Sequence, residues 1–145
     1  MRSFHHGRWA VNGMTQTGVP PLITTLLVSY NTRELLDPCL AALRLALLPI
    51  GGGTVVVVDN ASRDGSAAHL AQAAPDVTLI RSGANLGFGR ANNLALAHAQ
   101  TPFVLLLNTD AFIEPDGLRL PLAYMASNPN CGILGVRLVG RDGDL

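Results

Sequence analysis

Residues 54–60 read Thr-Val-Val-Val-Val-Asp-Asn, a run of four valines that stops at two polar residues. β-Branched side chains pack well on a pleated surface, and an unbroken apolar run is typical of a strand covered on both faces, as in parallel sheets. The stretch therefore predicts a buried strand at 54–58, with Asp59 and Asn60 at its carboxyl end.

Short apolar runs and segments with helical spacing alternate on both sides of this strand. In one such segment, between Thr32 and Pro49, the residues Leu36, Leu40 and Leu43 recur at helical spacing. The alternation predicts βαβ units, and therefore an α/β fold: a Rossmann-like α/β/α sandwich with a mostly parallel sheet. Strands are also expected at 22–29, 77–80, 103–107 and 133–138, and further helices at 65–74, 87–99 and 115–128.

Length and charge narrow the class of protein. The chain has 145 residues, 48% of them apolar, which leaves room for one domain. Residues 1–20 show no sustained period, so we expect a poorly ordered extension there and a single domain over 21–145. Ten basic and ten acidic residues cancel to a net charge of zero without any basic block. This balance argues against a domain that binds nucleic acid through phosphate charge.

The cysteines and the hydropathy pattern bear on the compartment. Cys39 and Cys131 are too few for a disulfide framework and lack the spacing of a zinc site. Buried free thiols are typical of a reducing compartment. No stretch approaches the roughly 20 apolar residues of a membrane span. We therefore expect a cytoplasmic protein, and peripheral attachment to the inner face of a membrane stays open.

Polar residues follow each of the first four predicted strands. In an open parallel sheet the carboxyl ends of the strands share one edge, and ligands bind there. Four polar clusters at that edge predict a crevice for a hydroxyl-rich ligand. The clusters are Ser29-Tyr30-Asn31, Asp59-Asn60, Ser82-Gly83-Ala84-Asn85 and Asn108-Thr109-Asp110.

Individual residues in these clusters allow more than one role. Asp59 is a charged acceptor suited to ribose hydroxyls or a base N–H, or else it caps the turn into the next helix. Asp110 suits a hard divalent cation beside phosphates, or it is a turn aspartate. The segment 87–92 is either a ligand contact or a tight turn that lets a helix pack closely. Residues 30–34 contain no glycine, which argues against a nicotinamide dinucleotide.

Four motifs together resemble the family 2 glycosyltransferases of GT-A fold, particularly the rhamnosyltransferase-like subgroup. They are Val28–Asn31, Val56–Ser66, Asn85–Asn93 and Leu106–Asp110, and the resemblance covers about residues 22–140. It implies an inverting transferase that moves a sugar from a UDP- or dTDP-sugar to a glycan or lipid-linked acceptor.

The resemblance also implies roles for the motif residues. The turn at 29–31 lies against the nucleotide, Asp59 binds the base or ribose, and the segment 85–93 lines the cleft. Asp110 helps to hold Mg²⁺ or Mn²⁺ on the diphosphate, and Asn108 stands where the family motif has its first aspartate. The predicted nucleotide-sugar site is therefore Ser29, Tyr30, Asn31, Asp59, Asn60, Asn85, Gly87, Asn92, Asn108 and Asp110, with Asp110 as the metal ligand.

The catalytic base stays unassigned. An inverting displacement needs a carboxylate placed to take a proton from the acceptor hydroxyl. The resemblance implies that an acceptor-binding half beyond this stretch supplies it, so we expect the chain to be the donor-binding portion. Two alternatives stay open: a non-catalytic nucleotide-sugar binding module, and a truncated domain that self-associates through an exposed apolar patch.

Overall fold

The computed structural model describes residues 21–140 and 143. The extension expected at 1–20 lies outside this range. Four strands form one parallel sheet in the order β3-β2-β1-β4, which confirms the predicted α/β fold. The strands are β1 (Ile23–Ser29), β2 (Thr54–Asp59), β3 (Thr78–Arg81) and β4 (Phe103–Asn108).

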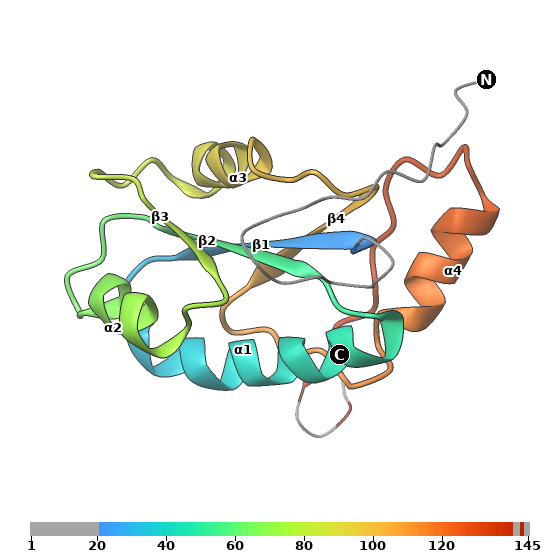
Figure 1. Ribbon diagram of the computed structural model, residues 1–145, viewed down its shortest axis with the longest axis horizontal. Coiled ribbons are helices and arrows are strands. Elements are labelled where there is room, and N and C mark those ends of the chain that lie inside the picture. Colours follow the sequence, from blue (N-terminus) through green and yellow to red (C-terminus); the bar gives the residue numbers. More distant parts are fainter. Residues whose placement is uncertain (1–20, 141–142, 144–145) are drawn as a thin grey trace, which may run out of the picture.

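Helices cover both faces of the sheet. In Figure 1, α1 and α2 lie on one face and α3 on the other. The larger core cluster lies on the α1 side and includes Leu36, Leu40 and Leu43 of α1; the smaller one joins Ala91 and Ala95 of α3 to the sheet. The helices are α1 (Arg33–Leu47), α2 (Ser66–Ala73), α3 (Phe88–Leu96) and α4 (Arg119–Ser127), with a short 3₁₀ turn, η1 (Leu48–Ile50), after α1.

The valine run on β2 is buried on both faces because it lies between these two layers. Val57 belongs to the α1-side cluster, and its neighbours Val56 and Val58 belong to the α3-side cluster. A strand in the interior of a parallel sheet needs apolar side chains on both faces, which four consecutive valines supply. The chain enters β2 through Gly53, where a Cβ atom would lie 2.7 Å from Leu47 Cδ2.

The expected fifth strand at 133–138 is wrong. Residues 131–140 lie within the described range and have no strand assignment there. Ile133 is 93% exposed and Leu138 is 73% exposed. An apolar run becomes a strand only where a neighbouring strand offers a ladder of backbone hydrogen bonds, and none of the strands in the described part of the chain pairs with this segment. The last helix also begins later than expected, because turns at Glu114–Gly117 and Asp116–Arg119 precede it.

One part of the sheet stays uncovered. α3 packs on β1 and β2, and the β4 side chains that share this face, Val104 and Leu106, are 39% and 58% exposed. β4 is also an edge strand. Among the helices of the described range, none combines the length and the hydrophobicity needed to cross a bilayer.

Candidate functional site

The predicted polar clusters meet at one edge of the sheet. Ser29 at the end of β1 pairs with Asp59 of β2, and the preceding Val28 pairs with Asn108 of β4. Neighbouring strands lie about 4.8 Å apart, so the ends of β2 and β4 are separated by about 10 Å across β1. The strand order reverses between β1 and β4, and ligands of open α/β sheets bind at such a switch point.

Asp59 holds a buried carboxylate oxygen that has no partner. The residue is 4% exposed, and its Oδ2 accepts a hydrogen bond from the Ser62 backbone N–H at 3.2 Å. Its Oδ1 is buried without any hydrogen bond. A buried acceptor without a donor is costly, because it has lost its water without gaining a partner. One oxygen therefore caps the turn into α2, and the other has no donor among the described residues.

A cavity of about 330 Å³ opens at this edge, beside the end of β2. Tyr30 and Phe88 are aromatic residues that are 47% and 56% exposed. The cavity is thus walled by two aromatic side chains and by amide groups, a combination that suits a planar, polar ligand such as a nucleobase. Its lining residues are Val28, Tyr30, Thr32, Asn60, Asn85, Gly87 and Phe88.

Asn60 fixes the wall of this cavity. The residue is 3% exposed; its Nδ2 donates to Asn85 Oδ1 at 3.0 Å, and its Oδ1 accepts from the Leu86 N–H at 2.8 Å. Asn85 Oδ1 also accepts from the Gly87 N–H at 2.9 Å. Gly87 has a φ of +76°, a conformation that a residue with a side chain rarely adopts, and it leads directly into α3. The loop between β3 and α3 is therefore tied to the end of β2.

A second set of hydrogen bonds joins the loops after β1 and β2. Asn31, at a φ of +54°, accepts from the Arg63 N–H at 2.8 Å and donates its own N–H to Ser62 Oγ at 3.0 Å. Asp64 Oδ2 accepts from the Arg33 N–H at 2.9 Å, and its Oδ1 accepts from Ser66. Burial raises the pKa of Asp64, but the hydrogen bonds from Ser66 and Arg33 outweigh it, and the pKa lies below its usual value.

The predicted residues thus divide into two groups. Tyr30, Asn60, Asn85 and Gly87 line the cavity, and the other six do not. Ser29 is fully buried with its hydroxyl 3.0 Å from Thr32 Oγ1, and the buried Asn92 donates its amide to the Phe88 carbonyl at 3.0 Å. Each of these two polar side chains hydrogen-bonds within the protein.

Thr32 and Phe88 line the cavity and were not singled out from the sequence. Phe88 carried a usable signal, since a large apolar residue between Gly87 and Gly89 at a helix start has no core to enter. Thr32 carried no such signal, because a threonine directly before a helix is ordinarily a helix cap, although its side chain makes no capping hydrogen bond here.

Asp110 lies in a tight turn after β4. The Ala111 N–H donates to the Asn108 carbonyl at 3.1 Å, and both Asn108 and Asp110 are exposed. Beneath the turn, burial raises the pKa of the Cys39 thiol to about 11, and the charge of Asp110 adds to the effect. Within residues 21–140, no three His, Cys, Asp or Glu residues gather as a metal site. One carboxylate fits a hard cation only when water and a ligand's phosphates supply further oxygens.

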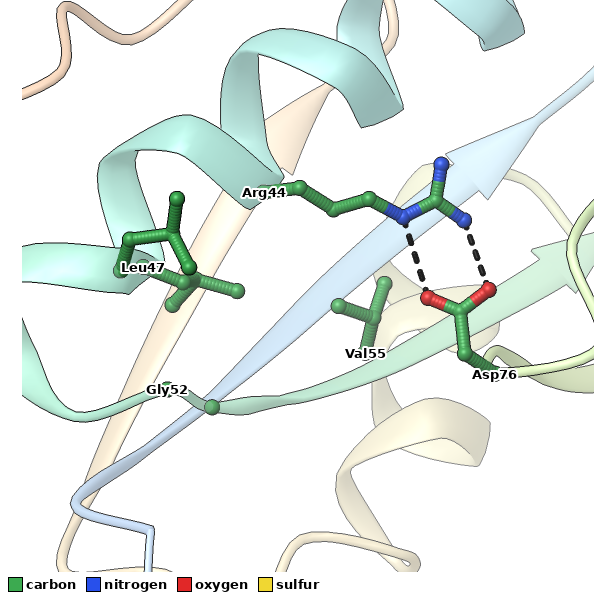
Figure 2. Close-up of a pocket in the computed structure, with 7 residues that line it drawn as sticks. Arg44, Leu47, Gly52, Val55 and Asp76 are labelled. Carbon is green, nitrogen blue, oxygen red and sulfur yellow. Dashed lines mark hydrogen bonds and ion pairs between the residues drawn. The ribbon is translucent and has the colours of Figure 1, made fainter.

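A second cavity of about 340 Å³ opens around the amino end of β2, beside the last turn of α1 (Figure 2). Arg44 and Asp76 face each other there, with Nε and Nη2 at 3.0 and 2.7 Å from the two carboxylate oxygens. The hydrogen bond from Arg44 lowers the pKa of Asp76. The charged groups of this cavity neutralise each other, and none of the predicted site residues lies in it.

Comparison with known proteins identifies the family of the chain. Residues 24–145 match the model of the family described as Glycosyl transferase family 2. The chain belongs to this family. It is 31% identical over 141 residues to the N-acetylglucosaminyl-diphospho-decaprenol L-rhamnosyltransferase of two Mycobacterium tuberculosis strains. That match covers 89% of this chain and 44% of the relative, so the chain spans less than half of the relative's length.

Solved glycosyltransferase structures share the fold. The mannosyltransferase PcManGT from Pyrobaculum calidifontis, in complex with GDP-Man and Mn²⁺, is 30% identical, with a TM-score of 0.67 over 73% of this chain and 32% of that one. S. aureus TarS 1-349 in complex with UDP is 23% identical, with a TM-score of 0.66 over 74% of this chain and 33% of that one. The sheet and its helices therefore correspond to part of the GT-A glycosyltransferase fold.

Proposed function

We propose that this domain binds a nucleotide-diphosphate sugar and forms the donor-binding portion of an inverting glycosyltransferase. The observation that carries the proposal is the buried Oδ1 of Asp59, which lacks a partner among the described residues and directly precedes Asn60 in the wall of the cavity at the carboxyl edge of the sheet. Family membership supports it, as do the UDP, UDP-GlcNAc and GDP-Man named with similar structures.

The nucleotide moiety occupies the cavity at the end of β2. Asp59 Oδ1 accepts the ring N–H of a pyrimidine or a ribose hydroxyl, because an ionised carboxylate offers only acceptors. Tyr30 and Phe88 provide apolar ring faces for a planar base. Asn60 and Asn85 hold the wall in place before the ligand arrives, which lowers the entropic cost of binding. A UDP- or dTDP-sugar is the donor that these groups fit.

The diphosphate lies toward the turn after β4. Asp110 would help to hold Mg²⁺ or Mn²⁺ there, with Asn108 beside it, and such a cation would offset the charge of the leaving diphosphate. Ser29 supports the loop after β1, and Asn92 supports the first turn of α3, since the polar group of each forms a hydrogen bond within the protein. Asn31 joins the loops after β1 and β2 and so holds Tyr30 beside the base.

The acceptor is a glycan or a lipid-linked sugar. The similar rhamnosyltransferase carries a diphospho-decaprenol acceptor in its name, which supports a lipid-linked one. We therefore propose a cytoplasmic domain that meets its acceptor peripherally at the inner face of a membrane. Transfer with inversion needs a base on the acceptor hydroxyl, and no residue described here is assigned to that role.

Nucleotide titration of the whole chain tests the proposal. UDP or dTDP is expected to raise the melting temperature, and the rise is larger with Mn²⁺ than without it. Asp59→Asn is expected to weaken nucleotide binding about tenfold with or without metal, because it removes the charged acceptor. Asp110→Asn is expected to remove mainly the gain that Mn²⁺ provides.

The matched control is Asp116→Asn. Asp116 is exposed in the turn before α4, and only its backbone carbonyl is engaged, by the Arg119 N–H. The Asp116→Asn variant removes the same charge, and it is expected to leave the nucleotide dissociation constants with and without Mn²⁺ unchanged. The proposal is wrong if no nucleotide shifts the wild-type melting temperature, or if the three variants lose affinity equally.

A further inference from the structure

The turn that carries Asp110 rests on a cysteine of α1. Cys39 is 1% exposed, and its Sγ lies 3.7 Å from the Asn108 carbonyl oxygen and 3.6 Å from that of Ala111. These two carbonyls are the first and last of the turn, and the Ala111 N–H donates to the first of them. One thiol thus contacts both ends of a four-residue turn from below.

Little else in the described range holds this turn from beneath. Thr109 is buried, but no side-chain hydrogen bond joins residues 108–111 to the rest of the described chain except those from the thiol. The loops after β1, β2 and β3 differ, because each is tied to a neighbour through asparagine, serine or aspartate side chains. The backbone ladder to β1 holds Asn108, and Ala111 packs on the larger core cluster, so the thiol at position 39 is the side-chain polar contact that helps to set the height of Asp110 above the sheet edge.

We propose that Cys39 is a positioning residue that sets the height and orientation of the Asn108–Ala111 turn, and through it the reach of Asp110 toward a divalent cation. This inference rests on the proposed function. The thiol fits the place by size and by polarity. Sulfur is large enough to fill the space under two carbonyls, and the S–H group is a weak donor that one or both can accept.

Three substitutions separate size from polarity. Cys39→Val fills the space with apolar atoms, slightly more than the thiol occupies, and sets a methyl group against two carbonyl oxygens. Cys39→Ser keeps a donor but reaches less far, and Cys39→Ala keeps neither property. The matched control is Leu43→Val, at a fully buried residue one turn further along α1 in the same core cluster. It weakens the same core without touching the turn.

The first readout is the ratio of nucleotide dissociation constants, for UDP or dTDP, without and with Mn²⁺. Cys39→Val and Cys39→Ala are expected to lower this ratio about threefold, while the constant without metal changes less than about twofold. Cys39→Ser is expected to recover part of the ratio. Leu43→Val is expected to lower the melting temperature and to leave the ratio unchanged. If Cys39 had a purely structural role, its variants would show this same pattern.

The second readout needs no ligand. Hydrogen exchange of the Ala111 amide reports the turn directly, and it is expected to be about tenfold faster in Cys39→Val than in Leu43→Val. Unchanged exchange and an unchanged ratio in Cys39→Val overturn the proposal. If wild-type protein binds no nucleotide, the proposed function fails, and the exchange result alone then decides whether Cys39 holds the turn.

Discussion

Leu26 and Leu106 are register partners on adjacent strands and point to the same face of the sheet, yet their surroundings are opposite. Leu26 of β1 is fully buried under α3, and Leu106 of β4 is 58% exposed. The loops and the C-terminal segment also differ. Side-chain hydrogen bonds join the loops after β1, β2 and β3 to one another, whereas residues 131–140 form neither a helix nor a strand. Within the described residues, the loops at the ends of β1, β2 and β3 are thus joined to one another, and the β4 side chains on the α3 face stay exposed.

The largest expected effect on stability tests this contrast between Leu26 and Leu106. Leu26→Ala is expected to lower the free energy of unfolding by about 3 kcal/mol, because it leaves a cavity between the sheet and α3. Leu106→Ala makes the same change on the partner strand and is expected to cost less than about 1 kcal/mol, since water already reaches the side chain. Urea denaturation of both variants measures the difference. Similar losses would show that β4 is covered in solution.

The next largest effect on stability concerns the hydrogen bonds that join the loop from β3 to α3 to the end of β2. Asn60→Ala leaves the Leu86 N–H without its acceptor and leaves Asn85 Oδ1 with the Gly87 N–H as its remaining donor, and it is expected to cost about 2 kcal/mol. It is also expected to weaken nucleotide binding, because the loop from β3 to α3 loses its anchor. Asn128→Ala is the matched control: its amide donates to the Tyr124 carbonyl at the exposed end of α4. A cost of about 0.5 kcal/mol is expected there.

The contrast also explains which predictions from the sequence hold. The valine strand on β2 and the helix with Leu36, Leu40 and Leu43 were predictable, because each pattern is local and agrees with the layers around it. The convergence of the four polar clusters was predictable as well, since parallel strands share one carboxyl edge. The strand expected at 133–138 was wrong, because strand formation depends on a partner that no local pattern encodes.

The division of the site residues was not predictable. Whether Asn60 supports a loop or contacts a ligand depends on hydrogen bonds to residues 85 and 86, which lie 25 and 26 positions away. The sequence also places Ser29 beside Tyr30 without revealing that one is fully buried and the other 47% exposed. Side-chain direction at the end of a strand is set by packing between layers, so it emerges only from the assembled fold.

Acid is expected to weaken the cross-linked loops by a smaller amount. The pKa of Asp64 lies below its ordinary value of 3.8, so its hydrogen bonds stabilise the fold fully above that value. The contribution is lost as the pH falls through the lower, folded-state pKa. Asp64→Ala is expected to cost about 0.5 kcal/mol at pH 7, because the group is largely exposed to solvent.

Unfolding free energies of both proteins across the pH range measure this effect. The wild type and Asp64→Ala are expected to converge at acidic pH, where the carboxyl group is protonated and no longer a charged acceptor. A constant difference from pH 7 to pH 2 would show that the charge of Asp64 contributes nothing to the joined loops.

The smallest effect on stability is expected from the exposed side chains of β4, where substitution is expected to change self-association of the protein instead. Val104 and Leu106 form an exposed apolar pair on an edge strand, and the chain carries no net charge to oppose contact between copies. Val104→Thr with Leu106→Gln is expected to change the unfolding free energy by less than about 0.5 kcal/mol, because both side chains already contact water. Light scattering across a concentration series is expected to show less self-association in the double variant than in the wild type. Leu45→Gln, which alters a leucine that is 53% exposed on α1, removes an apolar area similar to that of Leu106 alone at a place away from β4, and it is the control. An equal fall in association for both proteins would mean that apolar area in general drives it, whereas a fall confined to the β4 variant assigns it to the uncovered strand.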